Sequence, residues 1–352
     1  MAGAYLHIPF CASRCDYCAF ATWTDRGHLI DEYLAALATE VDRAVAAGMG
    51  PVDSVFVGGG TPTLVPAESL VAVLGRVPRV PDAEVTVEAN PDSVSAASIE
   101  AYRDGGVTRM SFGVQSMDPS VLRSLGRTHD PANVRRAVAW TRAAGFETFN
   151  LDLIMGGAGE SVDGWSATLD AVVDLAPPHV SAYSLTVEPG TPLADDPARH
   201  PDDDDQATKY LLTVERLGAA GFDWYEVSNW AQPGHECRHN RLYWDAGDYL
   251  GFGCAAHSHR GGRRWWNLRT PERYIEAIRR GDPTEAAAEE LDDETRRMEA
   301  LQLALRTREG VPVEALDLDD PALDGLVSVR DERAVLTPHG RLLANEVAIR
   351  LR

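Results

Sequence analysis

The sequence contains no run of about 18 consecutive apolar residues, so it offers no candidate transmembrane helix. Its first ten residues, MAGAYLHIPF, lack the basic start and the long apolar segment of a secretion signal. Basic residues are scarce, since 33 Lys and Arg stand against 54 Asp and Glu, and the formal net charge is −21. A surface of this sign repels phosphate backbones, and no dense block of Lys and Arg offsets it. We therefore expect a cytoplasmic protein with no membrane segment and no nucleic-acid partner.

Cysteine is also rare, with five in 352 residues, yet three of them fall within CASRCDYC at residues 11–18. Cytoplasmic thiols stay reduced, so clustered cysteines indicate a metal or catalytic site rather than disulfides. Thiolates at short spacing bind zinc or iron–sulfur clusters. Structural zinc needs a fourth ligand, which here would be His7 or His28. A four-iron cluster held by three cysteines leaves one iron open for a cofactor or substrate. Three cysteines without any ligand are the least favoured alternative.

The amino-terminal half of the chain alternates short apolar runs with longer amphipathic segments. The predicted strands are residues 5–8, 54–57, 84–88, 109–112, 148–154 and 180–185, and the predicted helices are residues 30–47, 67–77, 95–104, 119–125, 133–144 and 161–175. This repetition predicts an α/β fold with a parallel sheet and right-handed crossovers. The strands are too few for a closed (β/α)8 barrel, so we predict an open, partial (β/α)6 barrel over residues 1–185.

The remaining chain is predicted to form a second, smaller unit. Residues 186–206 are rich in Pro and Asp and are predicted to be a linker or long loop. Four aspartates at 202–205 are interpreted as solvated residues leading into a helix at 207–219, in preference to a cation site. Residues 207–352 are predicted to be an α+β domain with a winged-helix-like end, serving as a lid or structural cap because the charge disfavours DNA binding.

Glycine-rich and polar motifs follow most of the predicted strands, and loops at the carboxyl ends of such strands usually hold the chemistry. The motifs are GGGTPT, VEANPD, GVQS, LGRTH and NLDLI. Glycines let backbone amides approach a ligand closely. Carboxylates accept hydrogen bonds from hydroxyl and ammonium groups, and Arg pairs with a carboxylate. Each motif alone suits an ordinary turn, but on successive strand ends they predict one site.

The C-x3-C-x2-C spacing after YLHIPF, followed in order by these motifs, resembles the radical S-adenosylmethionine (SAM) enzymes over essentially the whole chain. In that family three cysteines hold a [4Fe–4S] cluster, SAM chelates the open iron, and an electron from the cluster cleaves SAM to a 5′-deoxyadenosyl radical. The resemblance implies that Cys11, Cys15 and Cys18 hold such a cluster. The positions that match SAM-contacting residues are Tyr5, Tyr17, Gly59, Gly60, Thr61, Glu88, Gln115, Arg127 and Asp152.

Within that family the chain resembles two related groups, the oxygen-independent coproporphyrinogen III dehydrogenases (HemN) and the haem chaperones (HemW). HemN proteins carry a further cysteine where this chain has Phe20, and a long N-terminal extension before the position of Tyr5. HemW proteins carry an H-N-x-x-Y-W motif, which HNRLYW at residues 239–244 matches. The resemblance implies that His239, Asn240, Tyr243 and Trp244 contact haem, and imidazole and aromatic rings suit an iron and a porphyrin face. Without the resemblance, a structural anchor is the simpler interpretation.

The favoured hypothesis is a haem chaperone that binds haem, transfers it to acceptor proteins, and retains a [4Fe–4S] cluster and SAM. The axial ligand is left open among His239, Tyr243, Cys254, His257 and His259. The alternative is an enzyme, a coproporphyrinogen III dehydrogenase that converts two propionates to vinyl groups in porphyrin biosynthesis. Radical modification of RNA is disfavoured by the charge. The expected partners are haem and haem-accepting proteins, and peripheral contact with membrane proteins is left open.

Overall fold

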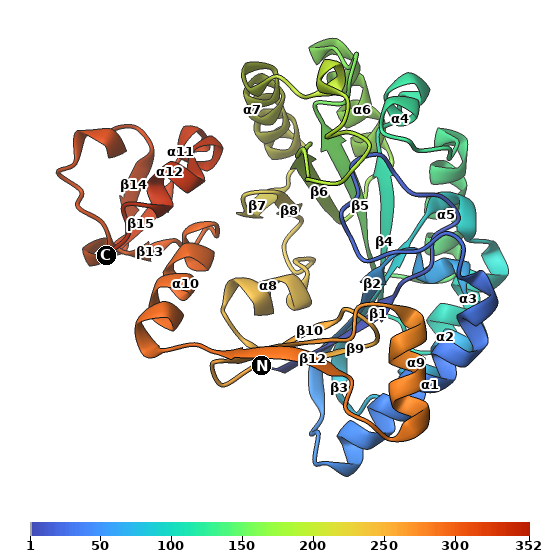
Figure 1. The fold of residues 1–352 in the computed structure, drawn as a ribbon. Helices are drawn as coiled ribbons and strands as arrows, with labels where there is room; N and C mark the ends of the chain where they lie inside the picture. Colours follow the sequence, from blue (N-terminus) through green and yellow to red (C-terminus); the bar gives the residue numbers. More distant parts are fainter. Residues whose placement is uncertain (1) are drawn as a thin grey trace.

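The computed structural model describes residues 2–352 and shows a curved sheet with helices on its outer face (Figure 1). Six parallel strands form its centre in sequential order. They are β1 (Ala2–Ile8), β2 (Val52–Gly59), β3 (Arg79–Ala89), β4 (Arg109–Gln115), β5 (Thr148–Met155) and β6 (His179–Ser184). The helices between them are α1 (Ile30–Ala46), α2 (Ala67–Leu74), α3 (Ala96–Asp104), α4 (Pro119–Ser124), α5 (Pro131–Ala143) and α6 (Val162–Asp174). The predicted partial (β/α)6 barrel is confirmed.

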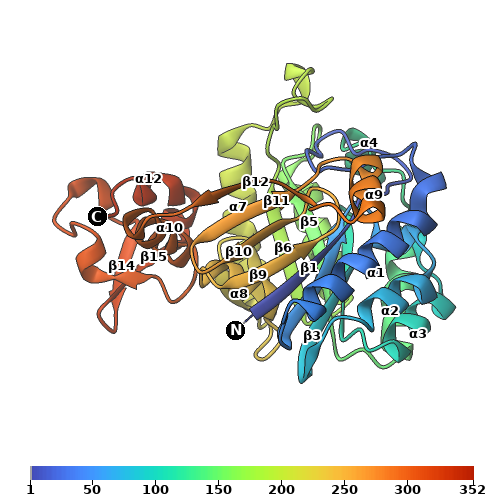
Figure 2. The same ribbon diagram turned by 60° about the horizontal axis from the view of Figure 1, so that its bottom comes forward.

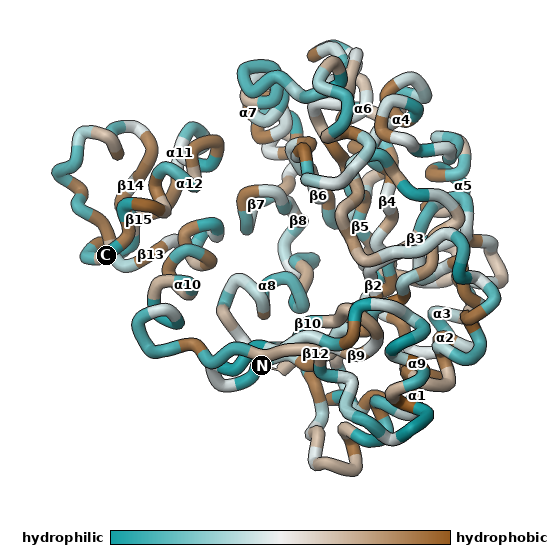
Figure 3. The backbone as a smooth tube through the Cα atoms, in the orientation of Figure 1, coloured by the Kyte–Doolittle hydropathy of each residue, from teal (hydrophilic) through white to brown (hydrophobic). Residues whose placement is uncertain are grey.

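The two faces of these strands carry different side chains because successive residues of a strand point to opposite sides. The outer-facing residues are apolar and fully buried, as at Leu6, Val55 and Val87. The inner-facing residues are largely polar, and Ser111 and Asn150 join their neighbours there in hydrogen bonds. Figure 3 shows the matching alternation of hydrophobic and hydrophilic residues along the outer helices. The apolar core therefore lies between the sheet and the helices, and the concave face is left for a site.

Six further strands extend the same sheet at both edges, which makes twelve in all. At one edge β8 (Asn229–Ala231) pairs with β6, and β7 (Asp223–Glu226) pairs with β8. At the other edge β9 (Asp248–Phe252) lies parallel to β1 and is followed by β10 (His257–Arg260), β11 (Arg263–Asn267) and β12 (Glu285–Glu290) (Figure 2). Strands from both sides of residues 186–206, the predicted linker, thus belong to one sheet. The division of the chain into two domains at that linker stays a prediction.

Three helices accompany these strands: α7 (Asp203–Ala219), α8 (Arg238–Trp244) and α9 (Pro271–Arg280). Helix α7 begins earlier than the predicted residue 207. Asp202 caps it, because its carboxylate accepts a hydrogen bond from the backbone N–H of Asp205 at 2.9 Å. The run of aspartates therefore occupies the cap and first turn of the helix, near its positive end.

A buried carboxylate on α1 ties the added strands to the barrel. Glu40 accepts hydrogen bonds from the Gly253 amide (2.7 Å), the Asn267 side-chain amide (2.9 Å), and the hydroxyls of Tyr274 (2.7 Å) and Thr284 (2.7 Å). Burial raises the pKa of Glu40, while the four donors favour its charged form. This one side chain links α1 to α9 and to the segments on both sides of β10 and β11.

The last part of the chain forms a smaller unit beside the barrel (Figure 1). Its elements are α10 (Asp293–Leu305), β13 (Val311–Pro312), β14 (Val327–Arg330), β15 (Arg333–Leu336), α11 (Pro338–Leu342) and α12 (Ala344–Ala348). The three strands form an antiparallel sheet with its own apolar cluster, which includes Leu305, Leu336 and Val347. The expected smaller C-terminal unit with a strand–turn–strand–helix end is confirmed. Among residues 2–352, no helix combines the length and the hydropathy that a membrane span requires.

Candidate functional site

The cysteine loop, residues 10–23, follows β1 at the carboxyl end of the parallel strands. A bridge between Phe10 and Trp23 closes its base, with the Cys11 amide donating to the Trp23 carbonyl at 3.1 Å. All three cysteines of the loop are free and partly exposed. The loop therefore presents three thiols beside the strand ends, which is where the parallel sheet concentrates its other predicted site residues.

The glycine-rich turn after β2, which carries the GGGTPT motif, lies directly against the cysteine loop. A Cβ at Gly60 would lie 2.6 Å from the Phe10 carbonyl oxygen and 3.0 Å from the Cys11 sulfur, so only glycine fits there. The Thr61 hydroxyl lies 3.8 Å from the same sulfur. On the other side, the Arg127 guanidinium lies 3.5 Å from the Cys15 sulfur. The structure thus brings the GGGTPT and LGRTH motifs to the thiols.

The donor set suits an iron–sulfur cluster. Burial raises the pKa of the Cys11 and Cys18 thiols, so both are protonated without a metal, and binding releases those protons. Within residues 2–352, no three His, Cys, Asp or Glu side chains are arranged around a single metal ion. The three thiols of the loop would hold such a cluster together. The positive charge of Arg127 beside Cys15 offsets the negative charge of a thiolate-bound cluster.

Two carboxylates face the space next to the cysteine loop. Glu88 accepts a hydrogen bond from the Gly59 amide at 3.1 Å. Asp152 accepts from the Ser111 hydroxyl at 3.0 Å and from the side-chain amide of Asn150 at 2.8 Å. Burial raises the pKa of Glu88 to about 7, with a further contribution from the negative charge of Asp152, whose own pKa is also raised by burial. A cationic or hydroxyl-bearing ligand in this space would relieve their repulsion.

Replacing Glu88 with Gln is expected to stabilise the ligand-free protein at high pH. The native pKa of about 7 exceeds the ordinary value of 4.5, so the native state binds a proton that the unfolded state lacks between these values. The stability of the wild type therefore falls as the pH rises from 4.5 to 7, whereas the Gln side chain does not titrate. At pH 8 the variant is expected to gain roughly 1–3 kcal/mol in the free energy of unfolding. Urea unfolding at pH 8 and at pH 4.5 measures this, and an equal gain at both values would contradict it.

The end of β4 places one more predicted residue here, Gln115. Gln115 has a positive φ of 64° and is 9% exposed. A Cβ at Gly113 would lie 3.0 Å from the side-chain nitrogen of Gln115 and 3.0 Å from a guanidinium nitrogen of Arg127. The glycine therefore leaves room for both side chains. Gly113 was missed in the sequence, although GVQS contains it, because its role depends on the approach of Arg127 from a later loop.

Tyr5 stacks on Phe56 and is supported by His7, while Tyr17 packs against an apolar cluster that includes Leu125. The Tyr5 hydroxyl lies 2.9 Å from His7 Nδ1, and burial raises the pKa of both tyrosines. His7 Nε2 lies 2.9 Å from the Ala21 carbonyl oxygen, so the ring joins β1 to the cysteine loop. Both ring nitrogens of His7 are engaged, which leaves neither free as the fourth zinc ligand considered above. The sequence suggested His7 only as a zinc ligand, and its spacing of two residues from Tyr5 on one strand was the signal for this supporting role.

The HNRLYW segment forms α8, which packs on β1 and β2 at the concave face of the sheet (Figure 1). Glu84 caps the helix by accepting from the backbone amides of Arg238 (3.1 Å) and His239 (3.0 Å). His239 is 0% exposed, with Nδ1 2.9 Å from the Ser54 hydroxyl and Nε2 3.0 Å from the Tyr243 hydroxyl. Burial lowers its pKa to about 3. In this conformation His239 anchors α8, and haem contact through its ring would require both hydrogen bonds to break.

The other three residues of this motif are partly exposed. Asn240 lies on the same short helix, and Tyr243 meets Tyr249 edge to face at 4.7 Å. The Arg306 guanidinium lies 5.4 Å from the Trp244 ring centroid, while the Trp244 Nε1 has no hydrogen-bond partner among the described residues. Tyr243 therefore faces an aromatic side chain of the sheet, as His239 does through its stacking on Phe56 at 5.4 Å.

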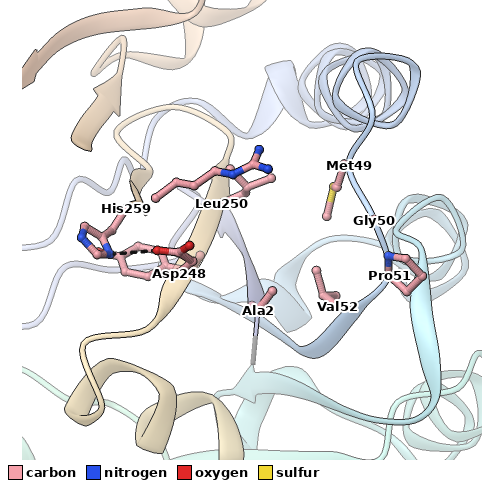
Figure 4. Close-up of a pocket in the computed structure, with 11 residues that line it drawn as sticks. Ala2, Met49, Gly50, Pro51, Val52, Asp248, Leu250 and His259 are labelled. Carbon is pink, nitrogen blue, oxygen red and sulfur yellow. Dashed lines mark ion pairs between the residues drawn. The ribbon is translucent and has the colours of Figure 1, made fainter. Parts of the chain in front are cut away.

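A separate cavity of about 190 Å³ lies at the amino end of β1, between the loop after α1 and β9 (Figure 4). Its lining includes Ala2, Val52 and Leu250, and the ion pair of His259 with Asp248 at 3.6 Å closes one side. The cysteine loop follows the opposite end of β1. Of the residues predicted for the site, only His259 lines this cavity.

Comparisons with known proteins agree with this geometry. Residues 5–172 match the Radical SAM superfamily. Coproporphyrinogen III oxidase (HemN) from Escherichia coli shares the fold, with a TM-score of 0.83 at 23% identity over 99% of this chain and 89% of that one. Barrel and cysteine loop together define a radical SAM protein.

Sequence comparison identifies the particular family. The chain is 43% identical to the protein named heme chaperone HemW of Mycobacterium tuberculosis (strain CDC 1551 / Oshkosh), over 98% of this chain and 93% of the relative. It is 35% identical to the protein of the same name in Escherichia coli (strain K12), over 97% and 96%. The chain belongs to the HemW family of radical SAM proteins.

Proposed function

We propose that this chain is a haem chaperone, which binds haem and transfers it to acceptor proteins. The observation that carries the proposal is the 43% identity, over 98% of the chain, to a protein named heme chaperone HemW. The partly exposed aromatic residues on the concave face support it because a porphyrin offers a large planar surface. Haem and haem-accepting proteins are the proposed partners, and the cytoplasm is the proposed place of action.

The proposed cofactors are a [4Fe–4S] cluster on Cys11, Cys15 and Cys18, and SAM. When bound, the cluster supplies the electron that can cleave SAM. The chain's own contribution is positional: Gly59 and Gly60 let the backbone come close, and carboxylates accept from ammonium and hydroxyl groups. The residues proposed to contact SAM are Tyr5, Tyr17, Gly59, Gly60, Thr61, Glu88, Gln115, Arg127 and Asp152.

The double substitution Glu88→Ala with Asp152→Ala is expected to weaken SAM binding. Each loss leaves a donor of the ligand without its acceptor, at a cost of roughly 1–3 kcal/mol per hydrogen bond. Equilibrium binding to the anaerobically reconstituted protein measures this. Glu100→Ala, an exposed carboxylate on α3, is the control that should leave the affinity unchanged. An unaltered affinity in the double variant would contradict this placement of SAM.

The proposed function is tested with the full chain in two assays. In the first, the haem-loaded protein is mixed with an apo-haemoprotein, and the absorbance spectrum is followed for transfer. In the second, the reconstituted protein is incubated anaerobically with coproporphyrinogen III, SAM and a reductant. We expect transfer in the first and no protoporphyrinogen IX in the second, because Phe20 stands where HemN proteins carry a further cysteine and its side chain is 70% exposed. Steady protoporphyrinogen IX formation would favour the dehydrogenase instead.

A further inference from the structure

The concave face carries a continuous row of aromatic and small residues that runs from the barrel onto the added strands. Residues opposite each other in a sheet share a face, as do alternate residues along one strand. Tyr5 lies opposite Gly251 of β9, and His257 of β10 lies opposite Trp266 of β11. Tyr249 lies opposite His259, which is on the same face as His257. The face next to the SAM space therefore continues onto His257 and Trp266.

The side chains of this row are only partly covered by their neighbours. His257 is exposed, and Tyr5, Tyr249 and Trp266 are partly exposed. The His257 and Trp266 rings stack with centroids 5.6 Å apart and an interplanar angle of 25°. A Cβ at Gly251 would lie 2.1 Å from the His257 carbonyl oxygen, so the lack of a side chain there lets β10 come close. Accessible rings on one face of a sheet suit a planar, largely apolar ligand.

The candidates for the haem-iron ligand differ in whether their donor atoms are free of hydrogen bonds and accessible. Both ring nitrogens of His239 are hydrogen bonded inside the fold. The Tyr243 hydroxyl is bonded to that same ring, and burial raises its pKa, so it is a neutral phenol. Cys254 is 0% exposed, and burial raises the pKa of its thiol to about 12. His259 Nδ1 lies 3.1 Å from the Gly247 carbonyl oxygen, and its ring is directed to Asp248 (Figure 4).

His257 differs from these four. No hydrogen bond within residues 2–352 occupies either of its ring nitrogens. Its pKa is lowered by partial burial and by the nearby Arg264, so the ring is neutral and offers a lone pair at neutral pH. Arg264 lies on the same face, since it is opposite His259, and it is partly exposed. Its guanidinium pairs with Glu289 and Glu299, each at 2.9 Å, so an anionic propionate would bind there in exchange for one of these carboxylates.

We propose that His257 is the axial ligand of haem, with Trp266 packed beside the porphyrin and Tyr243 and Tyr249 along its edge. This inference rests on the proposed haem-binding function. It assigns the buried His239 to the positioning of α8 and Tyr243, and it places the haem over β9, β10 and β11, next to the space proposed for SAM.

Haem titration of the full chain, followed by the Soret band, tests the assignment. Wild-type protein is expected to show a histidine-ligated spectrum. His257→Ala is expected to shift the band and weaken binding by about tenfold or more, since it loses a coordinate bond. His257→Gly with added imidazole should restore the wild-type band, which a merely structural role would not produce. The matched control is His339→Ala, an exposed histidine of the C-terminal unit, which should leave band and affinity unchanged.

The possible results distinguish a failure of the His257 assignment from a failure of the proposed haem-binding function. Wild-type protein that takes up no haem would contradict the proposed function. Wild-type protein that binds haem, beside a His257→Ala variant with the same band and affinity, would overturn the ligand assignment alone. Circular dichroism of each variant shows whether its fold is retained, and the imidazole experiment decides the case if His257→Ala proves less stable.

Discussion

Replacing any one of Cys11, Cys15 or Cys18 with Ser is expected to abolish stable binding of the [4Fe–4S] cluster. The three thiols are the cysteines of one loop, and a cluster held at two corners loses a third of its protein ligands. The other two cysteines cannot substitute. Cys237 is 1% exposed at the start of α8, where its sulfur lies 3.4 Å from a Glu84 oxygen, and Cys254 is 0% exposed beside Tyr33.

Anaerobic reconstitution with iron and sulfide measures this loss. The wild-type chain should hold about four of each, with an electron paramagnetic resonance signal after reduction that SAM perturbs. Cys237→Ala is the matched control, because it removes a thiol outside the loop and should keep the full iron content. Stoichiometric zinc with no bound iron in the wild type would contradict the cluster, and unchanged iron in a Cys15→Ser variant would contradict the ligand set.

Glu40→Ala is expected to destabilise the fold by about 3–5 kcal/mol, because it leaves several enclosed donors without an acceptor. Its carboxylate accepts from the Gly253 amide and from three side chains on the segments that join β9 to β12. These segments also carry His257 and Trp266. The variant should therefore lose haem affinity at temperatures where the central barrel remains folded.

Chemical denaturation of the purified variant measures the change. Glu32→Ala is the control, since Glu32 is an exposed carboxylate of the same helix and pairs with Arg279 at 2.7 Å on the surface. Such exposed pairs contribute about 0–1 kcal/mol. A loss below 1 kcal/mol for Glu40→Ala would show that the four hydrogen bonds do not hold the added strands.

The central barrel could be predicted from the sequence because its elements are local. Apolar runs such as residues 148–154, followed by amphipathic segments, indicate a strand and a helix without any knowledge of distant residues. The chain order then implies parallel neighbours, so the strand-end motifs fall on one edge. The residues near the thiols, from Gly60 to Asp152, follow from that edge.

The pairing of β9 with β1 could not be predicted, because it joins segments that lie more than 200 residues apart in the chain (Ala2 opposite Asp248). No local pattern shows which edge of a sheet a late strand joins. For the same reason the sequence left the iron ligand open. His239 and His257 are both histidines near aromatic residues, and only the fold shows that the first is enclosed by Ser54 and Tyr243 while the second is exposed.

The measurement that tests the central claim most directly is an equilibrium haem titration of the wild-type full chain, followed by the Soret band. The account predicts saturable uptake of about one haem per chain, with a band distinct from that of free haem. Absence of saturable uptake, or a spectrum identical to free haem at every ratio, would contradict the account.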